Sequence, residues 1–100
     1  VASRYAQQYE STYGADSRNA FAPYTYDAYL LLDAAVATIP ADAPAGTPAF
    51  RQALRDALES LQGTVGTQGI YMMSPTNHNG LDERGVVLMQ ARSGAWQFLP

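Results

Sequence analysis

The sequence contains no cysteine and no lysine. The absence of cysteine excludes disulfides, thiol catalysis and cysteine-based zinc sites, and it is compatible with the cytoplasm as well as with an export compartment. All six basic residues are arginines, they are scattered along the chain, and the formal net charge is -3. Because no basic surface is available for phosphates, nucleic acid is not an expected partner.

Long hydrophobic runs are also missing. The longest apolar stretch, residues 28–39, is interrupted by Asp33 and is shorter than the roughly 20 residues that a transmembrane helix needs. One hundred residues with 47% hydrophobic and 15% charged side chains fit a single small unit with a modest core. No membrane-spanning helix is expected.

A first helix is predicted over residues 1–13. Tyr5, Tyr9 and Tyr13 recur every four residues, and Gly14 follows where a helix C-terminus favours a positive φ. Two interpretations of the tyrosine stripe are open, namely packing with the hydroxyls at the rim and stacking on a ligand, and packing is the simpler one.

Two further helices are predicted over residues 24–38 and 48–61. The first is apolar nearly all round, begins near Pro23 and ends before Pro40. Four polar residues indicate its solvated side: Thr25, Asp27, Asp33 and Thr38. The second has Thr47 as a cap and Pro48 in its first turn. Its apolar face consists of Phe50, Leu54, Leu58 and Leu61.

From Gly63 onward the pattern changes to that of β-strands. A short strand is predicted at residues 68–73, and strands at 86–91 and 96–99 flank a turn as a hairpin. The predicted fold class is therefore α/β, with three helices followed by a short strand and a β-hairpin.

The only histidine, His78, stands in the polar stretch SPTNHNGLDE. A metal site needs three or four ligands and a catalytic histidine needs a positioned partner, and neither pattern is complete. Asn77, Asn79 and Gly80 instead suit a turn, so we expect a shaped connector with no catalytic residue, no metal and no cofactor. A small hydrolase-type enzyme that uses His78 remains an alternative, which depends on an acidic side chain beside His78 inside a pocket.

Three glycines, Gly63, Gly66 and Gly69, are spaced in a way that superficially suggests a phosphate-binding loop. A helix is not predicted after them and the chain has no lysine, so the P-loop signature fails on two counts.

The order of segments RYAQQYESTYG, AFAPYTYDAYLLLDAA, FRQALRDALESLQG and GTQGIYMMSPTNHNGLDERGVVLMQARSGAWQFL resembles the C-terminal part of a branched-chain amino acid type ABC-transporter substrate-binding protein. The resemblance covers nearly the whole chain. Its most specific elements are Tyr26-Asp27-Ala28, the Leu-x-Gly at residues 61–63, and the run from Met73 to Leu81.

The resemblance implies a two-lobed type I periplasmic-binding fold, with a solute in the cleft between lobes that are joined by three crossover segments. Residues 1–100 would be a single C-terminal fragment of it, with the export signal upstream and the closing hairpin in the other lobe. The implied function is that of an extracytoplasmic, for example periplasmic, solute-binding component of an importer for branched-chain or related amino acids. It would be a binding protein and not an enzyme, and its partners would be the small-molecule solute and an ABC permease.

The resemblance places one piece of the solute site in this chain. Phe21, and Tyr24 beside it, fall just before the buried helix, where the family often presents a side chain to the cleft. Packing of both residues between helices is an equally open interpretation.

The same fold is also used in ligand-sensing receptors and regulators, which is the alternative function. Because the apolar helix faces would lack their cover, the fragment is expected to self-associate as a dimer.

Overall fold

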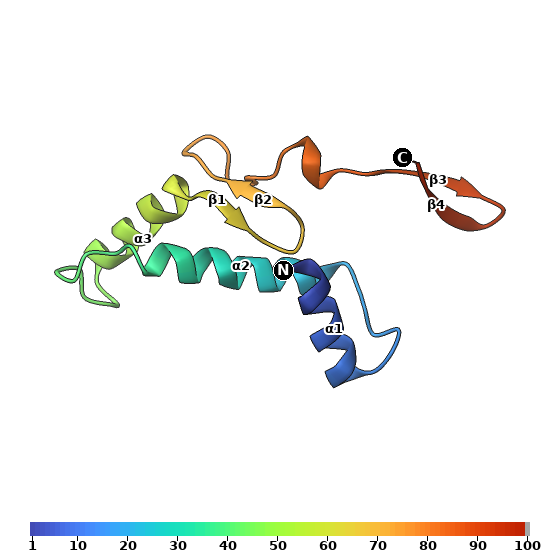
Figure 1. The fold of residues 1–100 in the computed structure, drawn as a ribbon. Coiled ribbons are helices and arrows are strands. Elements are labelled where there is room, and N and C mark those ends of the chain that lie inside the picture. The colour runs from blue at the N-terminus through green and yellow to red at the C-terminus, as the bar shows by residue number, and fades with distance from the viewer. Residues whose placement is uncertain (100) are drawn as a thin grey trace.

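The computed structural model describes residues 1–99. Within them, the helices α1 (Ala2–Tyr13), α2 (Phe21–Val36) and α3 (Pro48–Ser60) come first in the chain. They are followed by β1 (Gln62–Val65), β2 (Ile70–Met72), a 3-10 turn at Glu83–Gly85, β3 (Leu88–Arg92) and β4 (Ala95–Leu99) (Figure 1). This arrangement confirms the predicted α/β fold class of three helices followed by short β-structure.

The start of α2 differs from its predicted position at residue 24. Asn19 explains the difference, because its side-chain oxygen accepts hydrogen bonds from the backbone N–H groups of Phe21 and Ala22 at 2.9 and 2.8 Å. Two N–H groups that a helix leaves without partners are thereby satisfied, and the helix begins at Phe21. It ends at Val36, not at residue 38, because the next residues continue as a tighter turn.

The cap of α3 is confirmed. The Thr47 hydroxyl accepts a hydrogen bond from the backbone N–H of Phe50 at 3.1 Å, and Pro48 is the first helical residue. The apolar face of α3 packs against α2.

The strand β1 was not predicted. It pairs with β2 in antiparallel fashion, with Val65 opposite Ile70, so the predicted strand at residues 68–73 is only the second half of a hairpin. Gly63, from which the sequence pattern changes to that of β-strands, lies inside β1 with a φ of 75° at an irregularity in the strand pairing. A glycine is suited to that position, and the strand continues through it.

The strands β3 and β4 form a hairpin, as predicted, with boundaries shifted by one or two residues. The pairs Met89 with Phe98 and Ala91 with Trp96 lie directly opposite each other, so these four side chains share one apolar face. Every residue of both strands is exposed. Figure 1 shows the hairpin at the end of a long connector, away from the helices.

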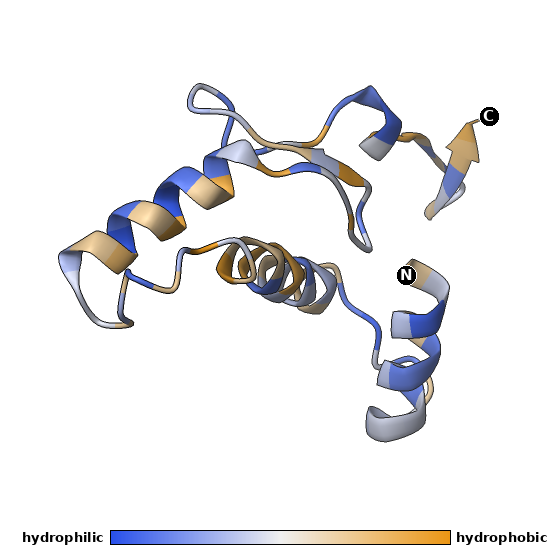
Figure 2. Cartoon of the chain, turned by 60° about the vertical axis from the view of Figure 1, so that its left-hand side comes forward, coloured by the Kyte–Doolittle hydropathy of each residue, from blue (hydrophilic) through white to orange (hydrophobic). Residues whose placement is uncertain are grey.

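The shape is extended. The radius of gyration is 17.1 Å, whereas a compact domain of this length has a value of about 13 Å. Among residues 1–99, the buried hydrophobic side chains are those of Ala35, Tyr71 and Met73. The surface of α2 that includes Leu32 and Val36 is uncovered, and the apolar character of this central helix is visible in Figure 2.

Within residues 1–99, the helices are all too short or too polar to cross a membrane.

Candidate functional site

A pocket of about 170 Å³ lies where α1, the α1–α2 connector, the start of α2 and the β1–β2 turn meet. Its lining consists of Ala2, Tyr5, Ala6 and Tyr9 of α1, Arg18 and Asn19 of the connector, Ala22 and Pro23 of α2, and Thr67 and Gln68 of the turn. Methyl groups, the proline ring and two tyrosine rings form its walls. The polar groups come from the connector and from the turn.

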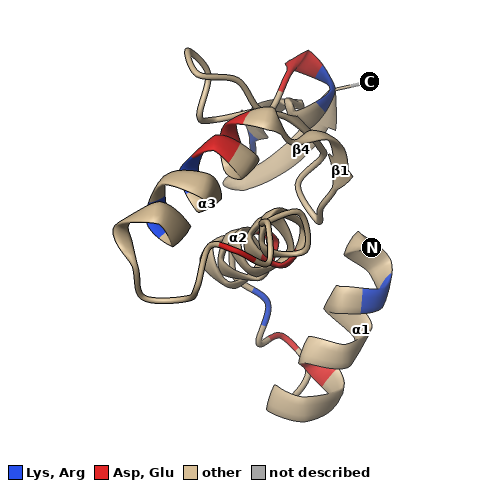
Figure 3. Cartoon of the chain, turned by 90° about the vertical axis from the view of Figure 1, so that its left-hand side faces the viewer, with Lys and Arg blue, Asp and Glu red and all other residues tan. Residues whose placement is uncertain are grey.

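The charged side chain in the pocket lining, Arg18, already forms an ion pair with Glu10. The guanidinium of Arg18 donates two hydrogen bonds to the carboxylate of Glu10, at 2.7 and 2.8 Å. The hydrogen bond from Arg18 lowers the pKa of Glu10, and the same contact raises the pKa of Arg18. The Arg18–Glu10 pair fixes the connector against α1, and it leaves little free charge for a ligand. Figure 3 shows the sparse distribution of charged residues along the helices and the connector.

The polar group at the start of α2 is engaged as well. The side-chain oxygen of Asn19 caps the helix, and its amide nitrogen lies 3.5 Å from the hydroxyl of Tyr9. The pocket therefore offers mainly apolar walls, which suit an aliphatic or aromatic group better than an anion.

The β1–β2 turn is held by Asp27. This residue was predicted to lie on the solvated side of the helix, and the structure corrects that prediction, because Asp27 is only 1% exposed. Its Oδ1 accepts a hydrogen bond from the backbone N–H of Thr67 at 2.6 Å, and its Oδ2 accepts from the N–H of Gln68 at 3.0 Å. The hydroxyl of Tyr71 donates a third bond, to Oδ2, at 2.9 Å. Three donors compensate the cost of burying the carboxylate.

Further contacts define the same turn. The Thr67 hydroxyl donates to the backbone carbonyl of Pro23 at 3.2 Å, in the first turn of α2. Burial, and then the hydrogen bond to Asp27, raise the pKa of Tyr71 above its ordinary value. The Tyr26-Asp27-Ala28 motif carried part of the family resemblance, but it did not indicate these contacts, and the helical pattern indicated an exposed aspartate.

The predicted binding residues Phe21 and Tyr24 lie in the first turn of α2, and the two residues are 81% and 52% exposed. Neither is packed between helices in this chain. Neither belongs to the pocket lining, although Ala22 and Pro23 between them do. The two aromatic side chains therefore stand at the same end of α2 as the pocket and outside it.

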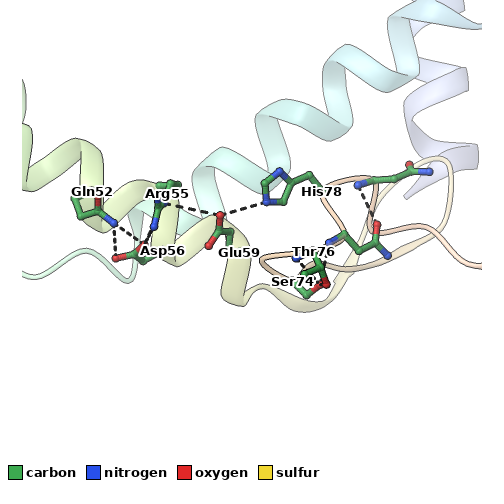
Figure 4. A network of polar contacts seen from close by, with 9 residues as sticks. Gln52, Arg55, Asp56, Glu59, Ser74, Thr76 and His78 are labelled. Atoms are coloured by element: carbon green, nitrogen blue, oxygen red, sulfur yellow. Dashed lines mark hydrogen bonds and ion pairs between the residues drawn. The ribbon is translucent and has the colours of Figure 1, made fainter.

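His78 and Glu59 approach each other at the surface. His78 Nε2 lies 3.2 Å from Glu59 Oε1, and the side chains are 65% and 17% exposed (Figure 4). Arg55 lies 3.8 Å from the same carboxylate oxygen. The hollow beside them is lined by Arg55, Leu58, Glu59, Met73 and His78, and this lining supplies no hydroxyl or thiol nucleophile. Within residues 1–99, no cluster of three potential metal-ligating residues is present.

The turn interpretation of this connector is confirmed. Ser74 Oγ accepts a hydrogen bond from the backbone N–H of Asn77 at 3.0 Å, and Asn77 Oδ1 accepts from the N–H groups of Asn79 and Gly80. The polar side chains of the stretch shape its backbone.

Comparison of the chain with protein-family models and with curated proteins gives no match. Solved structures do match. Protein Rp1789 from Rhodopseudomonas palustris strain CGA009 is 33% identical over 97% of this chain, with a TM-score of 0.83. An extracellular ligand-binding receptor from Rhodopseudomonas palustris is 34% identical over 95% of the chain, with a TM-score of 0.81. A third, an extracellular ligand-binding receptor from Rhodopseudomonas palustris HaA2, is 32% identical over 95%, with a TM-score of 0.82.

The chain spans only 27%, 26% and 27% of the lengths of these three structures. The match runs through the helices and through both hairpins, because it covers at least 95% of this chain. The chain therefore has the fold of one part of an extracellular ligand-binding receptor.

Proposed function

We propose that this chain is the C-terminal portion of an extracytoplasmic solute-binding protein that serves an ABC importer of branched-chain or related amino acids. The similarity to extracellular ligand-binding receptors over nearly the whole chain supports a solute-binding role. Coverage of only 26% and 27% of those receptors supports a larger whole protein. A periplasmic or other extracytoplasmic location and an ABC permease as partner belong to the same proposal.

The observation that carries the solute-binding role is the apolar pocket at the start of α2. Its arginine is paired with Glu10 and its asparagine caps the helix, so the free walls are those of Ala22, Pro23 and the tyrosines of α1. Such walls suit the side chain of an apolar amino acid. The exposed rings of Phe21 and Tyr24 extend this surface beyond the pocket and are the proposed aromatic contacts with the solute.

The uncovered surfaces support the same proposal. The apolar face of α2 and the apolar face of the β3–β4 hairpin are bare in this chain. A two-stranded hairpin without further packing is at best marginally stable in water. In the proposed whole protein, upstream segments cover α2, and the hairpin belongs to the other lobe.

Calorimetry on the longer protein that contains this sequence tests the solute site. We expect saturable binding of leucine, valine or phenylalanine, and a loss of at least about tenfold in affinity, roughly 1.4 kcal/mol, for Phe21→Ala. Tyr24→Ala should weaken binding in the same direction. Tyr29→Ala is the matched control, because Tyr29 is an exposed tyrosine on the same helix, and its affinity should stay within about twofold of wild type. Equal effects of all three substitutions would contradict the assignment.

The 100-residue chain by itself should bind none of these amino acids measurably, because a cleft needs both of its walls. Saturable micromolar binding by the chain alone would show that the site is complete without the other segments. The neighbouring genes separate import from sensing, since permease and ATPase genes beside this one support import.

A further inference from the structure

The carboxylate of Asp27 connects the two sides of the pocket. Ala22 and Pro23 line the pocket from α2, and Thr67 and Gln68 line it from the β1–β2 turn. Asp27 lies one helical turn beyond Pro23 and accepts the backbone N–H groups of both turn residues. We infer that Asp27 is a positioning residue, which sets the separation between the turn and the start of α2 and thereby the size of solute that the pocket accepts. The solute part of this inference rests on the proposed function.

The arrangement requires a carboxylate. One oxygen accepts from the N–H of Thr67, and the other accepts from the N–H of Gln68 and from the hydroxyl of Tyr71. An asparagine would offer one oxygen and one NH₂ group, and its NH₂ group would face an N–H donor. Asp27→Asn keeps the shape of the side chain, and it necessarily leaves one of the two turn amides without its acceptor.

Space between the turn and Asp27 is limited as well. A Cβ atom added at Gly66 would lie 2.5 Å from Asp27 Oδ2 and 2.6 Å from Tyr71 Cε2, so no side chain fits between the turn and these two residues. The hydrogen bonds from Thr67 and Gln68 to Asp27 therefore hold the turn directly against α2.

The other end of the hairpin is anchored without Asp27. The backbone N–H of Met73 donates to the carbonyl of Leu61 at 2.8 Å, and the N–H of Met72 donates to the carbonyl of Gly80 at 2.8 Å. The side chain of Gln62 donates to the Met73 carbonyl at 2.6 Å. A substitution at Asp27 should thus release the turn and leave the β1–β2 pairing in place.

Amide NMR on the 100-residue chain tests the positioning role without any solute. In Asp27→Asn we expect a changed amide proton shift and at least about tenfold faster hydrogen exchange at Thr67 or Gln68. The amide of Met73 should keep its exchange rate. Asp33→Asn is the matched control, because Asp33 is an exposed aspartate on the same helix, and it should change neither turn amide.

Unchanged turn amides in Asp27→Asn would overturn the inference. Simultaneous loss of protection at Met73 would also overturn it, because Asp27 would then support the hairpin as a whole.

The affinity ratio between a small and a large solute, valine and phenylalanine, provides the second readout in the longer protein. We expect Asp27→Asn to change this ratio at least about fivefold, and Asp33→Asn to leave it unchanged. A constant ratio together with altered turn amides would overturn the role in solute selection. If the unsubstituted protein binds neither amino acid, the proposed function fails, whereas the amide measurements still decide whether Asp27 positions the turn.

Discussion

The hydroxyl of Tyr71 donates a hydrogen bond of 2.9 Å to the carboxylate of Asp27, a residue 44 positions earlier in the chain. Both residues are buried, with exposures of 5% and 1%. The contact joins β2 to α2, and among residues 1–99 few other side chains are buried.

Replacement of Tyr71 by phenylalanine should lower the free energy of unfolding by about 1–3 kcal/mol, because a buried carboxylate loses one of its three donors. Urea denaturation followed by circular dichroism measures the change. The control is Tyr29→Phe, which removes an exposed hydroxyl and should change the free energy by less than about 0.5 kcal/mol. Equal stability of the Tyr71→Phe variant and the wild type would contradict the prediction.

Stability should fall in alkaline solution. Burial and the Asp27 hydrogen bond raise the pKa of Tyr71 in the folded chain, so the unfolded chain releases the phenol proton at a lower pH than the folded chain. The stabilisation is fully present below roughly pH 10, the ordinary pKa of tyrosine, and is lost as the pH rises above it. Urea midpoints between pH 8 and 11 should decrease more steeply for the wild type than for Tyr71→Phe. Parallel curves would argue against this linkage.

The substitution Gly66→Ala should destabilise the chain by about 1–3 kcal/mol or more, because the new methyl group overlaps the Asp27 carboxylate and the Tyr71 ring. Gly85→Ala provides the matched control, since a Cβ there would meet its nearest atom, the Gln68 carbonyl oxygen, at an ordinary 3.4 Å. Thermal denaturation of both variants distinguishes the two sites. A Gly66→Ala variant as stable as Gly85→Ala would show that the turn tolerates displacement.

His78 should be replaceable without loss of solute binding. Its ring is largely exposed and contacts Glu59, and the neighbouring asparagines shape the backbone of the connector. For His78→Ala in the longer protein, calorimetry should give an affinity within about tenfold of the wild type, roughly 1.4 kcal/mol. A larger loss would assign a binding role to this histidine.

The isolated chain should self-associate, with a dimer as the expected form. Exposed large side chains of α2 include Leu32 and Val36, and those of the hairpin include Trp96 and Phe98. Each large side chain that regains a dry contact contributes about 1.5–3 kcal/mol, and a second copy offers the same surfaces. Sedimentation equilibrium over a wide concentration range measures the state. A folded monomer of 10.8 kDa at every concentration would refute the prediction.

Local signals in the sequence predicted much of the fold. Thr47 and Pro48 identified the start of α3, and the two-residue periodicity around Ser93 and Gly94 identified the closing hairpin. Both features depend on residues close to one another in the chain. The start of α2 was placed too late because the role of Asn19 as a cap was not recognised, although the residue is of a suitable type.

The candidate site was harder to predict from the sequence than the fold. Asp27 was interpreted as a surface residue because an aspartate in an apolar helix ordinarily marks the solvated side. Its actual partners, the backbone N–H groups of Thr67 and Gln68, are 40 and 41 residues away. Almost every type of residue carries a backbone N–H group, so the residue types at positions 67 and 68 do not reveal that these groups bind Asp27. No pattern in the sequence could therefore indicate this contact. Phe21 and Tyr24 were selected by resemblance, and their role in binding stays a prediction.

The long separation between Asp27 and the β1–β2 turn also has a kinetic meaning. The helices and the two hairpins close through contacts between near neighbours, whereas docking of the turn on α2 closes a loop of 40 residues or more. Closing such a loop costs chain entropy before the hydrogen bonds offset it, so we expect the turn to dock after the helices have formed. Substitutions at Asp27 should then shorten the time for which the turn stays docked on α2 and leave the rate of docking nearly unchanged.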